Sequence, residues 1–379
     1  MTSYGISALA SALEGNILYQ WRFSRANIEL ARDDVDAYID SGGHAYGFST
    51  FLGHLDRHAI GEAESRELLR AHLVGVPSNV PPEIIRGITV IKLCQLTHGR
   101  NGISPMAYNR LLESFGTEVD SLMDLDASYG SGDVVCAAWW SEAVFGPEFG
   151  YSRGDVISLI NGHFVVPGLM LSIRGYLYGL FGRAGDVLAE VVARIPAVDN
   201  VQRPVSVRDL KPLISRLESS LAEYDKSIVL EANRPSGNPL FYETNRGLRP
   251  TSNSSFLSFE ISGAVSQMCD SVRILSTYLR SMTLALGRVL ETSDRAALRG
   301  AYFVQFPKVS KAYLDQIQSS LVDSVNYSQS ESVGIEDVGD GALIRFRRLQ
   351  GALPLLEKQI SLLEELVRRG DTGGPESRE

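Results

Sequence analysis

Apolar residues in the second half of the chain recur at spacings that alternate between three and four. Three stretches show this pattern, over residues 207–228, 261–289 and 346–367, and Pro354 interrupts the last of them. An average period of about 3.5 residues lines such side chains along one seam of a helix, and helices with continuous seams pack nearly parallel to one another. The sequence therefore predicts a mainly α fold in which residues 161–369 form a long helical bundle.

The predicted helices are longer than a compact globule needs. A bundle with several apolar stripes often completes its core by pairing with other copies of itself. We therefore expect a homo-oligomer, with a monomeric bundle as the alternative.

Residues 1–160 have a different character, because they are rich in glycine and in short polar segments. Shorter helical stretches lie between these segments. One helix is expected to begin near Pro81, since proline suits a first helical position and Glu83 suits the positive end of the helix dipole. Residues 370–379 have the composition of a disordered tail. The chain is thus expected to hold a glycine-rich helical part, a bundle and a tail.

Composition narrows the range of partners. The net charge is −9 with both signs interspersed, so no basic patch for nucleic acid is visible. No apolar run reaches the roughly 18 residues of a membrane helix, and we expect a cytoplasmic protein.

Cys94, Cys136 and Cys269 lie far apart in apolar surroundings and are expected to be reduced core residues. The histidines lack metal-ligand spacing, so no metal is expected.

The stretch Tyr129-Gly130-Ser131-Gly132-Asp133 suggests a specific chemistry. A serine between two glycines can cyclise its own backbone when the Gly132 amide nitrogen attacks the Gly130 carbonyl. Loss of two water molecules then leaves a methylidene-imidazolone ring whose exocyclic carbon comes from Ser131, and this ring is an electrophile. Glycines in such a stretch more often mark a tight turn, so the hypothesis depends on the rest of the chain.

Other short motifs occur in an order that resembles the aromatic amino acid ammonia-lyases and aminomutases, typified by histidine ammonia-lyase. The matching segments are Ala45-Tyr46-Gly47-Phe48-Ser49-Thr50, Leu68-Leu69-Arg70-Ala71-His72, Gly130-Ser131-Gly132-Asp133, Leu159-Ile160-Asn161-Gly162, Val201-Gln202-Arg203-Pro204-Val205-Ser206-Val207-Arg208, Asn233 with Asn238-Pro239-Leu240, Phe256, and Gly334-Ile335-Glu336-Asp337. The resemblance implies the histidine ammonia-lyase-like fold, a homotetramer and a small-molecule substrate.

The resemblance also implies catalytic roles. Eliminating ammonia requires an electrophile for the amine and a base at Cβ. The ring from Gly130-Ser131-Gly132, 4-methylidene-imidazol-5-one (MIO), supplies the electrophile, and Tyr46 is the base. A free tyrosine has a pKa near 10, so the site is expected to lower the pKa of Tyr46. Glu336 faces the amino group or the side chain of the substrate.

The remaining implied roles concern substrate binding. Arg208 binds the substrate carboxylate with both arms of its guanidinium. Asn161 and Gln202 hydrogen-bond the electrophile or the substrate, and Phe256 packs beside the ring. A histidine at His72 suits a substrate ring with a polar group, such as an imidazole or a phenol.

The chain departs from the family at several positions, and it is shorter than typical bacterial members. Gly130 replaces the usual alanine, which need not prevent cyclisation. Val205 replaces a tyrosine, so a hydroxyl near the electrophile and the amine is missing. Phe51 replaces a glycine and is expected to reshape the pocket. Ile335 and Val338 replace polar residues, so the site is expected to be more apolar.

Three functions follow. The first is an ammonia-lyase or 2,3-aminomutase of specialised metabolism that acts on an aromatic or related amino acid through MIO. The second is an enzyme of the same fold that lacks the ring and uses Tyr46, His72 and Glu336 as acids and bases for another elimination, cyclisation or isomerisation. The third is a non-catalytic scaffold.

Overall fold

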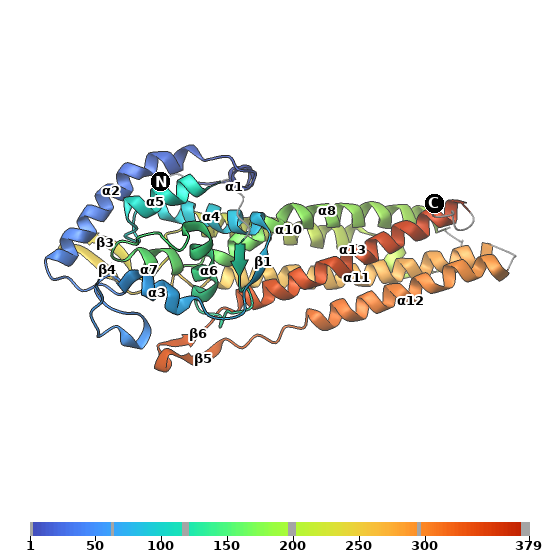
Figure 1. Cartoon of the computed structure of the whole chain (residues 1–379). Helices are drawn as coiled ribbons and strands as arrows, with labels where there is room; N and C mark the ends of the chain where they lie inside the picture. The colour runs from blue at the N-terminus through green and yellow to red at the C-terminus, as the bar shows by residue number, and fades with distance from the viewer. Residues whose placement is uncertain (1–2, 62–63, 116–120, 196–201, 294–296, 373–379) are drawn as a thin grey trace. The chain divides into compact units, whose positions relative to one another are not determined.

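The computed structural model describes residues 3–61, 64–115, 121–195, 202–293 and 297–372. These residues are mostly helical, which confirms the predicted mainly α class (Figure 1). They form two compact units. Unit 1 comprises residues 1–173, 224–263 and 325–346, and unit 2 comprises residues 174–223, 264–324 and 347–379, in each case as far as they are described.

Unit 1 holds most of the short elements. They are α1 (Ile6–Leu13), α2 (Tyr19–Asp40), η1 (Gly53–Leu55), α3 (Ser65–His72), β1 (Ser78–Val80), α4 (Pro82–Leu96), α5 (Pro105–Ser114), β2 (Ser121–Met123), α6 (Val134–Phe145), α7 (Asp155–Ile160), β3 (Leu240–Thr244), β4 (Gly247–Thr251), β5 (Ser328–Glu331), η3 (Ser332–Gly334) and β6 (Glu336–Val338). The strands pair antiparallel as β1 with β2, β3 with β4 and β5 with β6.

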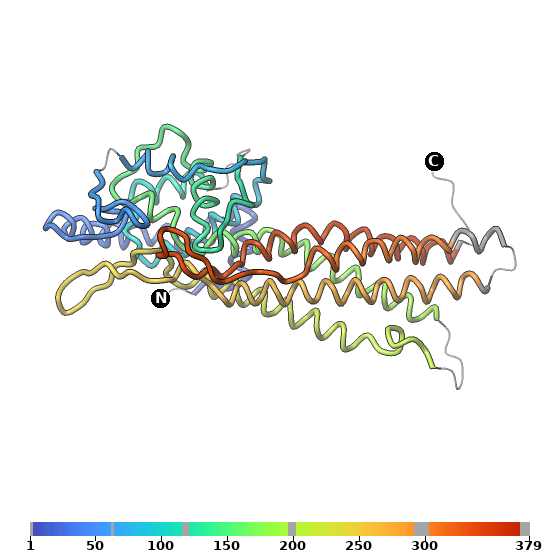
Figure 2. The backbone as a smooth tube through the Cα atoms, turned by 90° about the horizontal axis from the view of Figure 1, so that it is seen from below, coloured from blue at the N-terminus to red at the C-terminus, as the bar shows by residue number. Residues whose placement is uncertain are grey.

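Four long helices contribute residues to both units. They are α8 (Val165–Arg194), α10 (Lys211–Ala232), α11 (Phe259–Ser293) and α13 (Ala342–Thr372). Two more, α9 (Val205–Arg208) and α12 (Ala297–Ser320), lie in unit 2. Within unit 2 the long helices lie side by side (Figure 2). The amide of Gln359 on α13 donates to Ser276 O on α11 and to Ser310 O on α12, so a buried polar side chain joins three of them.

The apolar seams predicted from the sequence are buried. Along α11 and α13 the seam residues are at most 5% exposed, from Ile261 to Leu286 and from Phe346 to Val367. Pro354 lies inside α13 without ending it, since its neighbours Leu353 and Leu356 are packed in the core. Helix α13 also continues to Thr372, so the predicted tail is helical over its first three residues, and residues 373–379 lie outside the described part.

The first seam differs from the prediction of one helix. Helix α9 ends at Arg208, and Asp209 has an extended backbone with a φ of −153°. Its carboxylate accepts a 2.9 Å hydrogen bond from the backbone N–H of Lys211, which caps the start of α10. The predicted single helix is therefore divided at Asp209 into α9 and α10, although the apolar spacing continues across the break.

The two units do not follow the single boundary at residue 160 that the sequence favours. Unit 1 also takes in residues 224–263 and 325–346, because the β3–β4 hairpin and the β5–β6 pair return to it. Contacts between segments far apart in the chain, which sequence periodicity does not report, set this division.

Helix α4 forms the centre of unit 1. Every residue from Gly87 to Leu96 is buried, including Lys92. The helix begins at Pro82 with Glu83 in its first turn, as predicted. It approaches α8 closely, because a Cβ at Gly168 would lie 2.5 Å from Ile88 Cα. Only glycine fits there.

Helix α8 is the one described helix long and apolar enough to cross a membrane by length and composition. Buried core helices share this property, and 56% of its most apolar stretch is buried inside the protein.

Candidate functional site

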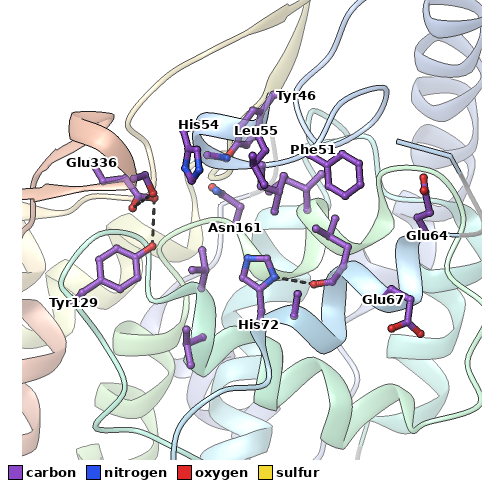
Figure 3. Close-up of a pocket in the computed structure, with 18 residues that line it drawn as sticks. Tyr46, Phe51, His54, Leu55, Glu64, Glu67, His72, Tyr129, Asn161 and Glu336 are labelled. Carbon is purple, nitrogen blue, oxygen red and sulfur yellow. Dashed lines mark hydrogen bonds between the residues drawn. The ribbon is translucent and has the colours of Figure 1, made fainter. Parts of the chain in front are cut away.

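A pocket of about 660 Å³ lies in unit 1 (Figure 3). Its wall comes from the loop of residues 45–55, from α3, from the start of α6, from α7 and from the η3–β6 segment. Four of the residues proposed from the sequence line it together, namely Tyr46, His72, Asn161 and Glu336. They lie far apart in the chain and meet only through the fold.

The backbone of Tyr46 is held by a tight turn. Ala45 and Phe48, on either side of it, are buried in a small apolar cluster with Ile157. Gly47 has a φ of +72°, and a Cβ there would lie 2.7 Å from the side chain of Ile157. The turn therefore needs glycine next to the tyrosine, which explains the local Tyr-Gly-Phe sequence.

The hydroxyl of Tyr46 accepts a 2.7 Å hydrogen bond from the backbone N–H of Gly53. Burial raises the pKa of Tyr46, the Gly53 bond lowers it, and the charge of Glu336 raises it further. The net effect is a raised pKa. The expectation that the site lowers the pKa of Tyr46 is therefore not met by the groups of this single chain.

Glu336 is held by two hydroxyl groups. Tyr129 Oη donates to Glu336 Oε1 at 3.3 Å, and Ser332 Oγ donates to Glu336 Oε2 at 2.8 Å. Burial and the carboxylate of Glu336 raise the pKa of Tyr129. No role for Tyr129 follows from the motifs in the sequence, although Tyr129 directly precedes Gly130.

His72 and Asn161 both line the pocket, and each has a polar atom that could accept a hydrogen bond. His72 Nδ1 lies 2.8 Å from Leu68 O, so in the neutral ring Nδ1 carries the proton and Nε2 is an acceptor. Asn161 Oδ1 is buried and accepts no hydrogen bond from the described part of the chain. The carbonyl oxygen of Asn161 accepts a 3.1 Å bond from the buried Lys92, whose pKa burial lowers to about 7.

The Gly130-Ser131-Gly132 motif lies between two residues that line the pocket, Tyr129 and Val134. Both glycines have positive φ, +91° and +77°, and Ser131 is 4% exposed. The carbonyl oxygen of Gly130 accepts a 2.9 Å hydrogen bond from the backbone N–H of Asp340.

Neighbouring side chains hold this loop. Ser128 Oγ accepts from the Gly130 N–H at 3.0 Å and donates to Asp133 Oδ1 at 2.5 Å. Burial and the charge of Asp340 raise the pKa of Asp133 to about 6. Phe256 packs on the other side, 3.4 Å from where a Cβ at Gly132 would be.

These residues fit the MIO ring. Neither glycine has a side chain to block the approach of the Gly132 nitrogen to the Gly130 carbonyl. A hydrogen bond from an amide N–H polarises that carbonyl for attack. The unpartnered Asn161 Oδ1 would also suit a donor on the ring or on a substrate.

A buried cluster of charged groups supports the loop that holds Gly130. His163 lies between two carboxylates, with Nε2 3.3 Å from Asp340 Oδ2 and Nδ1 3.5 Å from Glu231 Oε2. Burial lowers the pKa of His163, but Glu231 and Asp340 outweigh it and raise the pKa to about 10. Ser258 donates its N–H to Asp340 Oδ2 at 2.8 Å and its hydroxyl to Glu231 Oε1 at 2.5 Å. The spacing of the histidines in the sequence gives no sign of this cluster, because Glu231 and Asp340 lie far from His163 in the chain.

Gln202 and Arg208 belong to unit 2 and are not among the residues that line the pocket. Both are exposed, and Arg208 Nε donates to Arg203 O at 2.7 Å. Val205 is 70% exposed. The side chains of these three residues therefore lie on the surface of unit 2.

Two expectations about the pocket wall have different outcomes. Phe51 does line the pocket, as the expected reshaping requires. Ile335 and Val338 do not, since they are 59% and 41% exposed and lie outside the wall. The prediction that they make the site more apolar is wrong, because of these three residues only Glu336 lines the pocket.

Sequence relatives share the N-terminal part of the chain. Residues 10–159 match the family described as aromatic amino acid lyase. The histidine ammonia-lyase of Aliivibrio fischeri is 28% identical over 134 residues, which cover 34% of this chain and 26% of that protein. Histidine ammonia-lyase 1 of Fusobacterium nucleatum is 26% identical over 135 residues, with the same two shares. The aligned regions therefore span about a quarter of the length of these relatives.

Solved structures resemble almost the whole chain in fold. The phenylalanine aminomutase of Pantoea agglomerans has a TM-score of 0.81 at 14% identity, covering 98% of this chain and 89% of that one. The ergothionase of Treponema denticola has a TM-score of 0.86 at 13% identity, covering 98% and 88%. Residues 10–159 therefore match the aromatic amino acid lyase family by sequence, and nearly the whole chain resembles these solved structures in fold.

Proposed function

We propose that this protein is an ammonia-lyase or a 2,3-aminomutase acting on an aromatic or related amino acid. The observation that carries the proposal is the pocket that gathers Tyr46, His72, Asn161 and Glu336 beside the Gly130-Ser131-Gly132 motif. The family and the fold point to the same chemistry. Specialised metabolism in the cytoplasm is the setting we infer.

Each of these four side chains has a role in this proposal. The MIO ring, when formed from Gly130-Ser131-Gly132, supplies the electrophile that holds the substrate amine. Tyr46 removes the proton from Cβ of the substrate. Glu336 faces the amino group, and His72 Nε2 accepts a hydrogen bond from the substrate ring. Asn161 Oδ1, buried and unpartnered among the described residues, accepts a hydrogen bond from the ring or the amine.

Three more residues complete the proposed site. Phe256, which packs on Gly132, lies beside the ring. Arg208 binds the substrate carboxylate, and Gln202 hydrogen-bonds the substrate or the electrophile. Both are exposed on unit 2. We propose that they act from a neighbouring copy in a homotetramer.

Mixed oligomers test this arrangement. Tyr46→Phe and Arg208→Ala are each expected to be inactive alone. Co-expressed, they regain part of the wild-type activity if the two residues serve one site from different copies, because some sites then receive both intact residues. No recovery in verified mixed oligomers would place both residues of one site in the same copy.

Intact-mass measurement of the purified chain tests the ring. Two lost water molecules lower the mass by about 36 Da, and Ser131→Ala, which cannot form the exocyclic carbon, provides the matched control. An unmodified wild-type mass contradicts the MIO mechanism.

The raised pKa of Tyr46 and the missing hydroxyl at Val205 favour one alternative, an enzyme that lacks the ring. It would use Tyr46, His72 and Glu336 as acids and bases. An unmodified mass together with equal activity of wild type and Ser131→Ala would support it. No turnover of any aromatic amino acid by either form would favour the scaffold.

A further inference from the structure

We propose that Tyr129 is a second proton-transferring residue of this pocket, a phenol that protonates the substrate nitrogen as the carbon–nitrogen bond breaks. Glu336 keeps Tyr129 protonated until that moment. This inference rests on the proposed elimination and adds a general acid to the base already assigned to Tyr46.

The two tyrosines of the pocket have hydrogen bonds of opposite sense. The Tyr46 hydroxyl accepts from the backbone N–H of Gly53 at 2.7 Å. The Tyr129 hydroxyl donates to the Glu336 carboxylate at 3.3 Å. A donor facing the oxygen stabilises a phenolate, whereas a carboxylate facing it stabilises the neutral phenol. The geometry therefore assigns the base to Tyr46 and the acid to Tyr129.

Burial and the charge of Glu336 raise the pKa of both tyrosines, so the sense of the hydrogen bond is what distinguishes the two groups. Burial, the charge of Glu336 and the hydrogen bond to Glu336 all raise the pKa of Tyr129, and an ionised Tyr46 raises it further. For Tyr46 the Gly53 bond opposes burial. Once Tyr46 is ionised, Tyr129 is thus held neutral.

The position of Tyr129 is fixed by groups on both sides. It directly precedes Gly130, in the loop held by Ser128 and Asp133. Its partner Glu336 is held in turn by the hydroxyl of Ser332 at 2.8 Å. In Figure 3 the Tyr129 hydroxyl points to Glu336, and both residues face the same pocket as Tyr46 and His72. The phenol is therefore placed where the amine of a bound substrate would meet the Gly130-Ser131-Gly132 motif.

Protons and electrons balance over one elimination. The Tyr46 phenolate takes the proton at Cβ, and the Cβ–H electron pair becomes the Cα–Cβ double bond. The carbon–nitrogen pair leaves on the nitrogen, which takes the proton from Tyr129 Oη. Tyr46 then holds a proton and Tyr129 has lost one. Transfer from Tyr46 to Tyr129 through water restores the starting state, so the two tyrosines share one negative charge throughout.

Tyr129→Phe tests the proposal by removing only the hydroxyl. We expect the variant to show the same loss of two waters from its sequence mass as wild type and the same thermal stability to within a few degrees. Its turnover of the amino acid that wild type converts is expected to fall about 10²-fold to 10⁴-fold, the usual range for losing a general acid. Tyr151→Phe is the matched control, because Tyr151 is also buried in unit 1 but contacts Phe145 and Phe149 outside the pocket.

A 3-fluorotyrosine at position 129 covers the case in which Tyr129→Phe does not fold. Fluorine acidifies the phenol with little change in shape, so the alkaline limb of the pH–rate profile is expected to move to lower pH. The charged and titratable groups that face Tyr129 are Glu336, Asp133 and Tyr46, and all three are unchanged in this variant.

The outcomes separate this inference from the proposed function. If wild type converts its amino acid and Tyr129→Phe does so at the same rate, the role of Tyr129 is overturned and the proposed elimination is not. The same conclusion follows if the alkaline limb of the pH–rate profile does not move in the fluorinated chain. A wild-type chain of unmodified mass that converts no amino acid overturns both. An unmodified but active wild type still supports Tyr129 if Tyr129→Phe loses the stated activity.

Discussion

The backbone N–H of Asp340 donates a 2.9 Å hydrogen bond to the carbonyl oxygen of Gly130. This bond joins the segment after β6 to the motif from which the ring would form, and it lies on the carbonyl that the Gly132 nitrogen would attack. Gly339 makes the approach possible, because a Cβ there would lie 2.8 Å from Gly130 O and 2.9 Å from Gln329 Oε1.

Gly339→Ala is therefore expected to push the two segments apart and to leave the intact mass unmodified. Gly263→Ala is the matched control, since a Cβ at Gly263 on α11 meets nothing within 4 Å. This control should show the same loss of two waters from its sequence mass as wild type. A fully cyclised Gly339→Ala chain would show that the Asp340 hydrogen bond is not needed for ring formation.

The His163 cluster predicts how stability depends on pH. The pKa of His163 rises from an ordinary 6.5 to about 10 in the folded chain. A raised folded-state pKa stabilises the fold fully below about pH 6.5, and this stabilisation is lost as the pH rises through about 10. Urea unfolding of wild type from pH 6 to pH 10 should show this decline.

His163→Gln removes the titrating group, so the decline between pH 6.5 and pH 10 should flatten in this variant. The free energy of unfolding measured on both proteins in one pH series gives the comparison. Equal slopes would mean that His163 is not charged in the native state.

Removing the hydroxyl of Tyr46 tests its role as base. Tyr46→Phe is expected to retain the loss of two waters from its sequence mass, because Tyr46 is not part of the Gly130-Ser131-Gly132 loop. Its kcat should fall about 10²-fold to 10⁴-fold. Tyr38→Phe, which loses only a bond to His44 O, serves as control. Tyr46→Phe with wild-type kcat would exclude Tyr46 as the base.

His72 is expected to select the ring of the substrate. Because Nδ1 faces Leu68 O, the neutral imidazole presents an acceptor at Nε2. His72→Phe should therefore shift the ratio of kcat/KM toward plain phenyl substrates, away from those with a hydroxyl or N–H, by at least about tenfold. His58→Phe, exposed and outside the pocket, should leave the ratio unchanged, and an unchanged ratio in His72→Phe would remove His72 from the specificity of the site.

Packing between α4 and α8 gives a prediction about stability. Gly168→Ala places a Cβ 2.5 Å from the Ile88 backbone and should destabilise the chain by about 1–3 kcal/mol or more. Gly175→Ala on the same helix meets nothing within 4 Å and should stabilise by about 0.5–1 kcal/mol through helix propensity. Thermal unfolding of both variants checks the pair, and similar shifts in the two would contradict the close approach.

Much of the fold follows from local sequence patterns. The seams of α11 and α13 are buried as predicted, since helix periodicity depends on residues three and four apart. The sequence missed the division of the first seam, because one capping side chain, Asp209, decides it. It also misjudged Ile335 and Val338, because position next to Glu336 in the chain does not show which side chains reach the pocket.

The helical bundle, the family resemblance and the candidate motif residues could be predicted from the sequence by itself, because each depends on neighbours in the chain or on their order. Only the tertiary structure decided which side chains meet. Tyr129 and Glu336 are 207 positions apart, and His163 lies between carboxylates from α10 and from the segment after β6. Long-range packing, and not spacing along the chain, brings the hydroxyl of Tyr129 to Glu336 in the pocket.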